Sequence, residues 1–315
     1  MSKVPAASVA TSVTLSRRQV LQSGLACGLA AVWPALAAAE GLQTRTIPSS
    51  GEALPVLGLG SWITFNVGND AELRRECAAV IAAFLDEGGR LIDSSPMYGS
   101  SQAVIGAALN SLDRSAQVFA ADKVWIDDAD QGPAQIEQSR QHWGVGKFDL
   151  LQVHNLLSWP AHLNTLFAMK ADARLRYVGI TTSHGRRHAE LEQVLRQHRL
   201  DFVQLTYNLF DRQAEQRLLP LAADRGVAVI VNRPFQQGAL LTRLARFDLP
   251  PWAADWGCQA WSQLLLKFIV SHPAVTCAIP ATSQVDHLKE NMQAARGPLP
   301  NTSERQRLIR YVESL

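Results

Sequence analysis

Eight short apolar segments recur along this chain of 315 residues, and the stretches between them carry apolar residues at helical spacing. The segments predict strands over residues 55–60, 90–95, 118–124, 148–155, 177–182, 202–208, 228–234 and 275–281. The intervening patterns predict helices near residues 71–88, 101–111, 133–144, 160–173, 186–198, 213–225, 257–271 and 284–295. Such alternation is typical of a parallel sheet with helical crossovers.

The same segments favour a closed barrel over an open sheet. Several, such as Val-Ala-Val-Ile-Val at residues 227–231, are apolar throughout, as expected of strands covered on both faces. An open dinucleotide-binding sheet carries a Gly-x-Gly-x-x-Gly turn after an early strand, but Gly58 and Gly60 have no third glycine at that offset. We therefore predict an α/β protein with one (β/α)8 TIM-barrel domain over residues 38–315, with residues 301–315 as a helix outside the barrel.

Four residues near the ends of successive predicted strands are candidates for chemistry. Asp93 and Tyr98 occur in Leu-Ile-Asp-Ser-Ser-Pro-Met-Tyr-Gly, Lys123 in Ala-Ala-Asp-Lys-Val, and His154 in Gln-Val-His-Asn. A lone strand-end Lys is most often solvated, and a lone His is most often a satisfied core residue. In a barrel, however, the carboxyl ends of the strands meet at one rim, where active sites lie. Together, the four residues predict a proton-transfer site.

The phenol is a suitable proton donor near neutral pH if its neighbours favour the phenolate. A free Tyr has a pKa of about 10, and an adjacent ammonium lowers the pKa of a phenol. Lys123 is the candidate for that ammonium, and Asp93 is the candidate carboxylate that keeps it charged. His154 is then placed to bond the oxygen that receives the proton.

At these positions the chain resembles the aldo-keto reductase superfamily, whose catalytic tetrad is Asp, Tyr, Lys and His on the same strands. The resemblance covers residues 42–295 and includes Gln-Thr-Arg-Thr-Ile-Pro and Leu-Pro-Val-Leu-Gly-Leu-Gly, which are similar to the family's N-terminal hairpin and first strand. It implies that Tyr98 protonates the oxygen of a small-molecule carbonyl substrate, that Lys123 and Asp93 tune Tyr98, and that His154 orients the substrate. It also implies a nicotinamide cofactor whose hydride reduces an aldehyde or ketone to an alcohol.

The resemblance extends to the cofactor site. The segment 279–291 has the family's spacing after the last strand, and a helix starting near Gln284 would aim N–H groups at a phosphate. The resemblance assigns cofactor binding to Thr181, Thr182, Gln204, Arg233, Thr282, Ser283, His287, Glu290 and Asn291. Ala281 and His287 stand where many members have Lys and Arg for the 2′-phosphate, so we expect NADPH without excluding NADH.

The resemblance also bears on two positions next to the nicotinamide. Several aromatic residues are candidates for the substrate pocket. Gln204 matches a Gln that bonds the carboxamide, whereas Asn232 stands where many members have a Tyr that stacks on the ring. Candidate substrate-pocket residues, each just after a strand on the catalytic rim, are Trp62, Trp125 and Phe235. Trp252 and Trp256 lie in a Pro-rich segment predicted as a long loop, which usually carries function or covers a site.

Two other functions stay open at this point. Lys123 could form a Schiff base, as in a barrel lyase or aldolase, and that chemistry would not require Tyr98 and His154 together. Alternatively, the barrel could keep its cofactor site and act as a regulatory partner without turnover. The intact set of four residues argues against the second alternative.

The N-terminus predicts export. Ser16-Arg17-Arg18-Gln19-Val20-Leu21 has the twin-arginine pattern, and an apolar stretch and the small-residue cleavage site Ala35-Leu36-Ala37 follow. We predict a Tat signal peptide over residues 1–37, recognised by the Tat export machinery, and a periplasmic mature protein. The apolar stretch is shorter than the ~20 residues that cross a bilayer. Because Tat substrates cross the membrane folded, this route suits a protein that acquires its cofactor before export.

Composition adds few constraints. Removing residues 1–37 takes away three of the 30 basic residues and none of the 28 acidic ones, which leaves a net charge of −1. That balance shows no bias toward nucleic acid or membrane surfaces. Cys77, Cys258 and Cys277 follow no disulfide-framework or zinc spacing, and the histidines show no metal-ligand spacing, so we expect no metal site. The sequence indicates no oligomeric state.

Overall fold

The computed structural model describes residues 41–315, so the predicted signal peptide lies outside the described residues. Eight parallel strands form a barrel: β3 (Leu59–Gly60), β4 (Leu91–Asp93), β5 (Phe119–Val124), β6 (Leu150–Val153), β7 (Tyr177–Thr181), β8 (Phe202–Thr206), β9 (Ala228–Asn232) and β10 (Cys277–Ala278). Neighbours in the sheet are neighbours in the chain. Bridges from Leu57 to Ala278 and from Gly60 to Ala281 pair the first strand with the last and close the barrel. All eight predicted strands are confirmed, although each is shorter than predicted.

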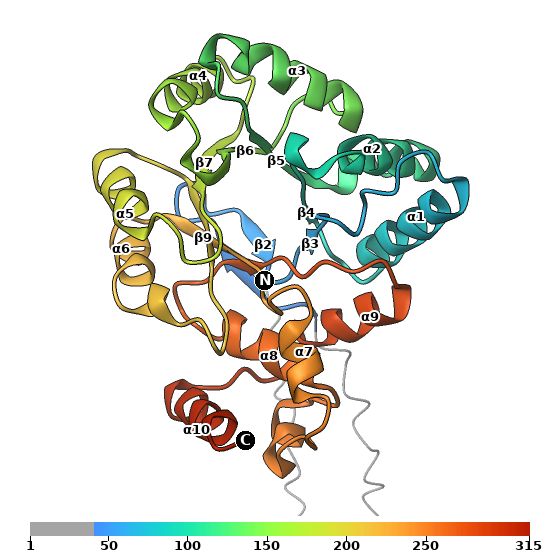
Figure 1. The fold of residues 1–315 in the computed structure, drawn as a ribbon, viewed down its shortest axis with the longest axis vertical. Coiled ribbons are helices and arrows are strands. Elements are labelled where there is room, and N and C mark those ends of the chain that lie inside the picture. Colours follow the sequence, from blue (N-terminus) through green and yellow to red (C-terminus); the bar gives the residue numbers. More distant parts are fainter. Residues whose placement is uncertain (1–40) are drawn as a thin grey trace, which may run out of the picture. The chain divides into compact units, whose positions relative to one another are not determined.

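Helices surround the strands in Figure 1. They are α1 (Ala71–Asp86), α2 (Ser101–Leu112), α3 (Gly132–Trp143), α4 (Trp159–Ala171), α5 (His188–Gln197), α6 (Leu218–Asp224), α7 (Ala239–Leu244), α8 (Trp261–Val270), α9 (Val285–Gln293) and α10 (Thr302–Glu313). The predicted helix over residues 213–225 is in fact a 3₁₀ turn, Gln213–Glu215, followed by α6. The predicted long loop before α8 contains α7 and a 3₁₀ helix, Pro251–Trp256. With six residues, α7 is too short to show a helical period in the sequence.

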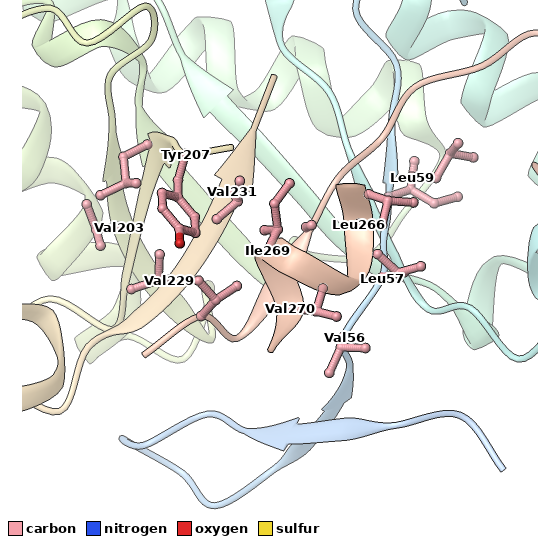
Figure 2. Close-up of a cluster of buried hydrophobic side chains, with 14 of the residues drawn as sticks. Val56, Leu57, Leu59, Val203, Tyr207, Val229, Val231, Leu266, Ile269 and Val270 are labelled. Carbon is pink, nitrogen blue, oxygen red and sulfur yellow. The ribbon is translucent and has the colours of Figure 1, made fainter. Parts of the chain in front are cut away.

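Apolar side chains form one cluster inside the barrel and another between the strands and the helices. Figure 2 shows part of the outer cluster, where Val229 and Val231 of β9 lie near Leu266 and Ile269 of α8. Inside the barrel, Tyr177 packs against its neighbours from β5 and β8, and the ring centroids lie 5.8 Å and 5.5 Å apart. Because side chains alternate along a strand, each of the strands β4 to β10 contributes residues to both the inner and the outer cluster.

An antiparallel hairpin of β1 (Thr44–Thr46) and β2 (Ala53–Pro55) covers the amino-terminal end of the barrel. Ile47 and Leu54 of this hairpin belong to the inner cluster together with Leu91, Phe119 and Phe202, which stand at the start of their strands. The predicted hairpin is therefore confirmed. It leaves the carboxyl ends of the strands as the open end, where a barrel builds its site.

The buried side chain of Arg305 holds the last helix, α10, against the rest of the fold. Arg305 of α10 donates hydrogen bonds to the carbonyl oxygen of Phe268 and, at 2.8 Å, to Ser271 Oγ. It also donates to the hydroxyl of Tyr207 and, at 2.9 Å, to the carboxylate of Glu215. These contacts hold α10 against α8, as expected for a helix outside the barrel. Across residues 41–315, none of the helices is long and apolar enough to span a membrane.

Candidate active site

Strand alternation places a polar layer above the inner apolar cluster. Asp93 comes two residues after Leu91, and Lys123 comes two residues after Ala121, both of which belong to that cluster. The same register holds on three further strands for Gln152, Gln204 and Asn232. Since residues two apart on a strand point to one face, these polar side chains point into the barrel at its carboxyl end.

The four residues predicted from the sequence come together at this end. Asp93, Tyr98 and His154 line one cavity of about 410 Å³. Tyr98 reaches it from a 3₁₀ turn, Pro96–Tyr98, shortly after β4, and its ring meets His154 edge to face with centroids 5.7 Å apart. Lys123 is fully buried, and its Nζ lies 5.0 Å from the centre of the Tyr98 ring.

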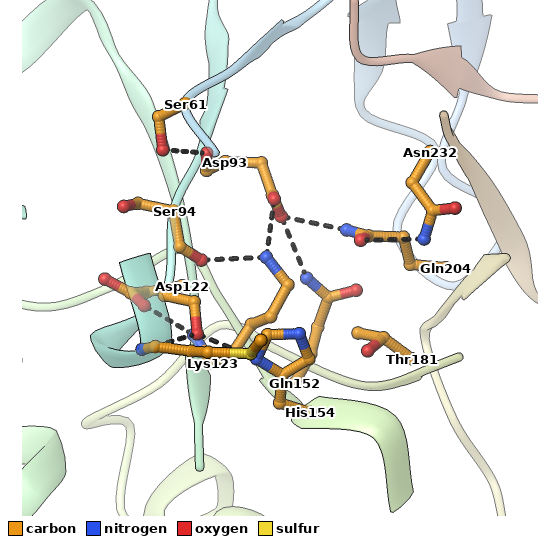
Figure 3. A network of polar contacts seen from close by, with 12 residues as sticks. Ser61, Asp93, Ser94, Asp122, Lys123, Gln152, His154, Thr181, Gln204 and Asn232 are labelled. Atoms are coloured by element: carbon orange, nitrogen blue, oxygen red, sulfur yellow. Dashed lines mark hydrogen bonds and ion pairs between the residues drawn. The ribbon is translucent and has the colours of Figure 1, made fainter. Parts of the chain in front are cut away.

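Lys123 and Asp93 form a buried ion pair (Figure 3). Lys123 Nζ donates to Asp93 Oδ2 at 2.5 Å and to the carbonyl oxygen of Ser94 at 2.8 Å. Both side chains are almost completely excluded from solvent. A buried charge is tolerated only when it is paired and hydrogen-bonded, and this geometry meets that requirement.

Two amide side chains hold the other oxygen of Asp93. Gln204 Nε2 donates to Oδ1 at 2.9 Å, and Gln152 Nε2 lies 3.3 Å from the same atom. Asn232 Nδ2 in turn donates to Gln204 Oε1 at 3.3 Å and to the carbonyl oxygen of Thr182 at 2.9 Å. Both polar atoms of the Gln204 amide are therefore engaged inside the protein, in addition to the carboxamide role that the family resemblance implies.

Burial and charge together set the protonation of this group. Burial disfavours the Lys123 ammonium, but the charge of Asp93 and, where Tyr98 is ionised, the charge of its phenolate outweigh burial and raise the pKa of Lys123. Burial also raises the pKa of Tyr98, and the charge of Lys123 offsets only part of that effect. Lys123 thus acts in the expected direction, but the net pKa of Tyr98 lies above its usual value because desolvation of the phenolate costs more. Tyr98 is a neutral phenol, able to donate a proton, at neutral pH.

His154 is neutral as well. Burial and, next, the charge of Lys123 hold the pKa of His154 well below its usual range. Its Nδ1 lies 2.8 Å from the hydroxyl oxygen of Ser95, which is fully buried. The hydrogen bond of the His154 ring to a described residue is made by Nδ1, so Nε2 is left without a partner among those residues, and the side chain lines the cavity.

A second buried carboxyl group lies behind Lys123. Asp122 points to the outer face of β5, where its Oδ2 accepts from Gln102 Nε2 at 2.8 Å and from Trp143 Nε1 at 2.5 Å. Its Oδ1 accepts the backbone N–H of Lys123 at 2.6 Å. Burial raises the pKa of Asp122 to about 7. This group ties the backbone of Lys123 to α2 and α3.

Gln152, Ser95 and Asp122 are site residues that were not predicted from the sequence. A signal was available for Gln152, because a Gln inside the apolar run Leu-Leu-Gln-Val interrupts a buried strand at an inward-facing position. Asp122 likewise interrupts the apolar run of its strand, Phe-Ala-Ala-Asp-Lys-Val, although at an outward-facing position. For Ser95, the sequence gives no indication that its hydroxyl meets a residue 59 positions away.

The residues assigned to cofactor binding fall into two groups. Thr181, Gln204 and Arg233 line the cavity, and the neighbouring Thr182 carries a buried hydroxyl without a partner. The second group lies outside that lining, at the start of α9 or within it, and comprises Thr282, Ser283, His287, Glu290 and Asn291. In this group Ser283 and His287 are exposed, while the carboxylate of Glu290 accepts the hydroxyl of Ser262 and joins α9 to α8.

Two of the three predicted substrate residues line the cavity. Trp62 and Phe235 do so, whereas Trp125 is 40% exposed and is absent from the lining. Ile63, Met97 and Leu241, which were not predicted from the sequence, add apolar surface to the lining.

The two loop tryptophans pack elsewhere. The Trp252 ring lies 5.9 Å from that of Tyr311, and Trp256 Nε1 is 3.4 Å from a carboxylate oxygen of Glu304. Both partners belong to α10. These tryptophans therefore secure the C-terminal helix, and neither is among the cavity's lining residues.

Comparisons with known proteins agree with this arrangement. The model of the aldo/keto reductase family matches residues 56–306. Methylglyoxal reductase YeaE of Escherichia coli is 29% identical over 259 residues, covering 79% of this chain and 89% of the relative. The NADH-specific methylglyoxal reductase of the same organism is 28% identical over 227 residues, covering 62% of this chain and 68% of the relative.

Solved structures share the fold. An aldo/keto reductase from Klebsiella pneumoniae, in complex with NADP and acetate, superposes with a TM-score of 0.73 at 24% identity, covering 86% of this chain and 95% of that chain. The glycerol dehydrogenase AKR11B4 from Gluconobacter oxydans gives a TM-score of 0.72 at 20% identity, covering 86% and 95%. Because the family match runs from the entry to β3 into α10 and so spans the whole barrel, this chain belongs to the aldo/keto reductase family.

Proposed function

We propose that this protein reduces an aldehyde or ketone to an alcohol with a reduced nicotinamide cofactor, and that Tyr98 is the general acid. The observation that carries the proposal is the convergence of Tyr98 and His154 on one cavity, directly above the buried Lys123–Asp93 pair. A neutral phenol beside a fixed ammonium is able to give a proton and to tolerate the negative charge left behind.

The cavity residues fit a nicotinamide nucleotide. Thr182 has a buried hydroxyl without a partner, and the Arg233 guanidinium makes no ion pair or hydrogen bond with any described residue. A carboxamide is a partner for the first group, and a phosphate is a partner for the second. Thr181 and Thr182 would hold the nicotinamide, whereas Arg233 and the N-terminus of α9 would hold phosphates.

NADPH is the cofactor we place first. An aldo/keto reductase from Klebsiella pneumoniae that shares the fold was solved with NADP, and a structure of an aldo-keto reductase from the same organism was solved with NADPH. NADH stays in the proposal because one Escherichia coli relative is named as NADH-specific. In addition, the exposed His287 at α9 is a weaker phosphate partner than an arginine.

When it is bound, the nicotinamide supplies the hydride that reaches the carbonyl carbon. Tyr98 donates its proton to the carbonyl oxygen, which yields the alcohol and a phenolate. The Lys123 ammonium, held by Asp93, stabilises that phenolate until a proton from solvent restores the phenol. His154, as a neutral imidazole, donates a hydrogen bond from Nε2 to the same carbonyl oxygen and fixes its position.

The lining favours a carbonyl compound with an apolar substituent. Trp62, Ile63, Met97 and Phe235 lie in the lining, and Ile63 and Met97 are among the few exposed large apolar side chains of the described chain. Exposed apolar surface at a cavity mouth gains most from an apolar ligand. Methylglyoxal, named for two relatives, is the small reference compound against which longer aldehydes are to be compared.

One alternative conflicts with the state of Lys123. A Schiff base requires a free amine, but the charges around Lys123 raise its pKa, and its Nζ is committed to Asp93 and to a backbone carbonyl. The other alternative, cofactor binding without turnover, assigns no task to these contacts of Lys123. Measuring turnover in the wild type and in the variant described next distinguishes this alternative from catalysis.

Replacing Tyr98 with Phe removes the proton donor and keeps the ring. We expect kcat/KM for carbonyl reduction to fall by about 10²–10⁴-fold, while the Kd for NADPH, followed by tryptophan fluorescence, stays nearly unchanged. Tyr311→Phe, which removes a phenol from α10, is the matched control and should keep full activity. Retention of most activity in Tyr98→Phe would remove Tyr98 as the acid, and absence of turnover in the wild type would favour a binding role.

Replacing Asp93 with Asn removes the counter-charge of Lys123 at nearly constant shape. Because the pKa of Lys123 is raised by that charge against burial, it should fall in the variant. Lys123 is charged only below its pKa, so the alkaline limb of the pH profile of kcat/KM should move to lower pH. The control Asp127→Asn removes an exposed carboxylate of the rim segment after β5. An unshifted alkaline limb in Asp93→Asn would contradict the role of the pair.

We also propose that the protein is exported by the Tat route, on the basis of Arg17, Arg18 and the apolar segment that follows them. Replacing both arginines with Lys should keep the full-length protein in the cytoplasm of a bacterial host with a working Tat pathway. Immunoblots of periplasmic and cytoplasmic fractions would show this. Equal periplasmic amounts of the wild type and the double variant would reject the proposal.

A further inference from the structure

Ser95 stands where two parts of the site meet. Its hydroxyl oxygen lies 2.8 Å from His154 Nδ1 and accepts the backbone N–H of Met97 at 3.2 Å. Its carbonyl oxygen accepts the backbone N–H of Tyr98 at 2.9 Å. One fully buried residue thus contacts the imidazole and begins the turn that carries the phenol.

The donors and acceptors around the Ser95 hydroxyl favour one placement of the protons. A serine hydroxyl has one proton to donate, and His154 Nδ1 is the one acceptor that the described residues offer it. If Nδ1 carried the proton instead, it would donate to Ser95 Oγ, and the buried Ser95 proton would have no acceptor. A buried donor without an acceptor is costly because it loses its hydrogen bond to water and gains none in the protein, so donation from Ser95 to Nδ1 is the favoured arrangement.

We propose that Ser95 is a positioning residue that fixes His154 as the tautomer with its proton on Nε2. A neutral imidazole has one N–H, and a hydrogen bond to one ring nitrogen decides which nitrogen carries it. With Nδ1 accepting from Ser95, Nε2 is the donor, and it is the ring nitrogen left without a protein partner in a side chain that lines the cavity.

This assignment deepens the proposed function, on which it rests, because a donor at Nε2 is what a carbonyl oxygen needs. With the opposite tautomer, His154 would present a lone pair to the carbonyl oxygen and repel it. The consequence of losing Ser95 should therefore appear in turnover, whereas cofactor binding should be little affected.

The adjacent serine offers a matched control for the tautomer of His154. Ser94 is also fully buried, but its hydroxyl pairs with Ser101 Oγ at 3.0 Å and has no contact with His154. Ser94→Ala and Ser95→Ala therefore delete the same atom from neighbouring positions of one segment. Ser95→Thr keeps a hydroxyl and is the conservative variant expected to rescue function.

The experiment combines nitrogen NMR with kinetics. In protein labelled with ¹⁵N-histidine, two-bond ¹H–¹⁵N spectra distinguish the two tautomers, and His154→Gln assigns the His154 signals among the eight histidines. We expect wild type, Ser94→Ala and Ser95→Thr to show His154 protonated on Nε2, and Ser95→Ala to show a mixture or the opposite tautomer. In Ser95→Ala, kcat/KM should fall by about ten- to a hundredfold, with the Kd for NADPH nearly unchanged.

Two results would overturn the proposal: a wild-type His154 protonated on Nδ1, or a Ser95→Ala variant with unchanged tautomer and activity. The first result needs no variant, so it decides the matter even if Ser95→Ala does not fold. The NMR result also needs no turnover. In a protein that reduces no carbonyl, an Nε2–H tautomer that is kept in Ser94→Ala and lost in Ser95→Ala would reject the proposed function and confirm the role of Ser95 in setting the tautomer.

Discussion

The candidate site depends on one buried ion pair, Lys123 with Asp93. Taking two charges out of water is costly, and their attraction offsets that cost only when the geometry is good and the remaining atoms are hydrogen-bonded. In this protein, both charged groups of the pair have further hydrogen-bond partners. Lys123 also reaches the carbonyl oxygen of Ser94, and Asp93 also accepts from Gln204 and, less closely, Gln152. The ammonium that Tyr98 needs therefore stays charged in a place where burial alone would neutralise it.

The fold supplies this geometry through its register. Parallel strands bring their carboxyl ends to one rim, and alternation turns every second residue inward, so polar residues from several strands form one layer. Below that layer the inner apolar cluster fills the barrel, and the N-terminal hairpin covers its amino-terminal end. On the outer face, Asp122 joins the backbone of Lys123 to Gln102 and Trp143. The site is thus held from inside and outside the sheet.

Sequence patterns were sufficient for the barrel and for the four residues around the cavity, because both follow from local features. Strand and helix periods repeat along the chain, and a polar residue that ends an apolar strand is visible without knowledge of the fold. Hydrogen-bond partners across strands are a different matter. That Gln204 bonds Asp93, or that Ser95 bonds His154, depends on which residues of distant strands and loops stand at the same height in the barrel. The short α7 was missed because six residues are too few to show a helical period. Trp252 and Trp256 were predicted to lie in a functional loop, because their contacts with α10 join segments that are distant in the sequence.

The buried pair implies that Asp93 and Lys123 act as one unit in catalysis. A double-mutant cycle in kcat/KM for carbonyl reduction tests it directly, with Asp93→Asn, Lys123→Met and the double variant compared with wild type. Residues that act as a unit show strongly non-additive losses. We predict that the double variant is about as active as the less active of the two single variants, because the second substitution removes a charge that already lacks its partner. Losses that multiply, so that the double variant falls by the product of the two single effects, would contradict the claim.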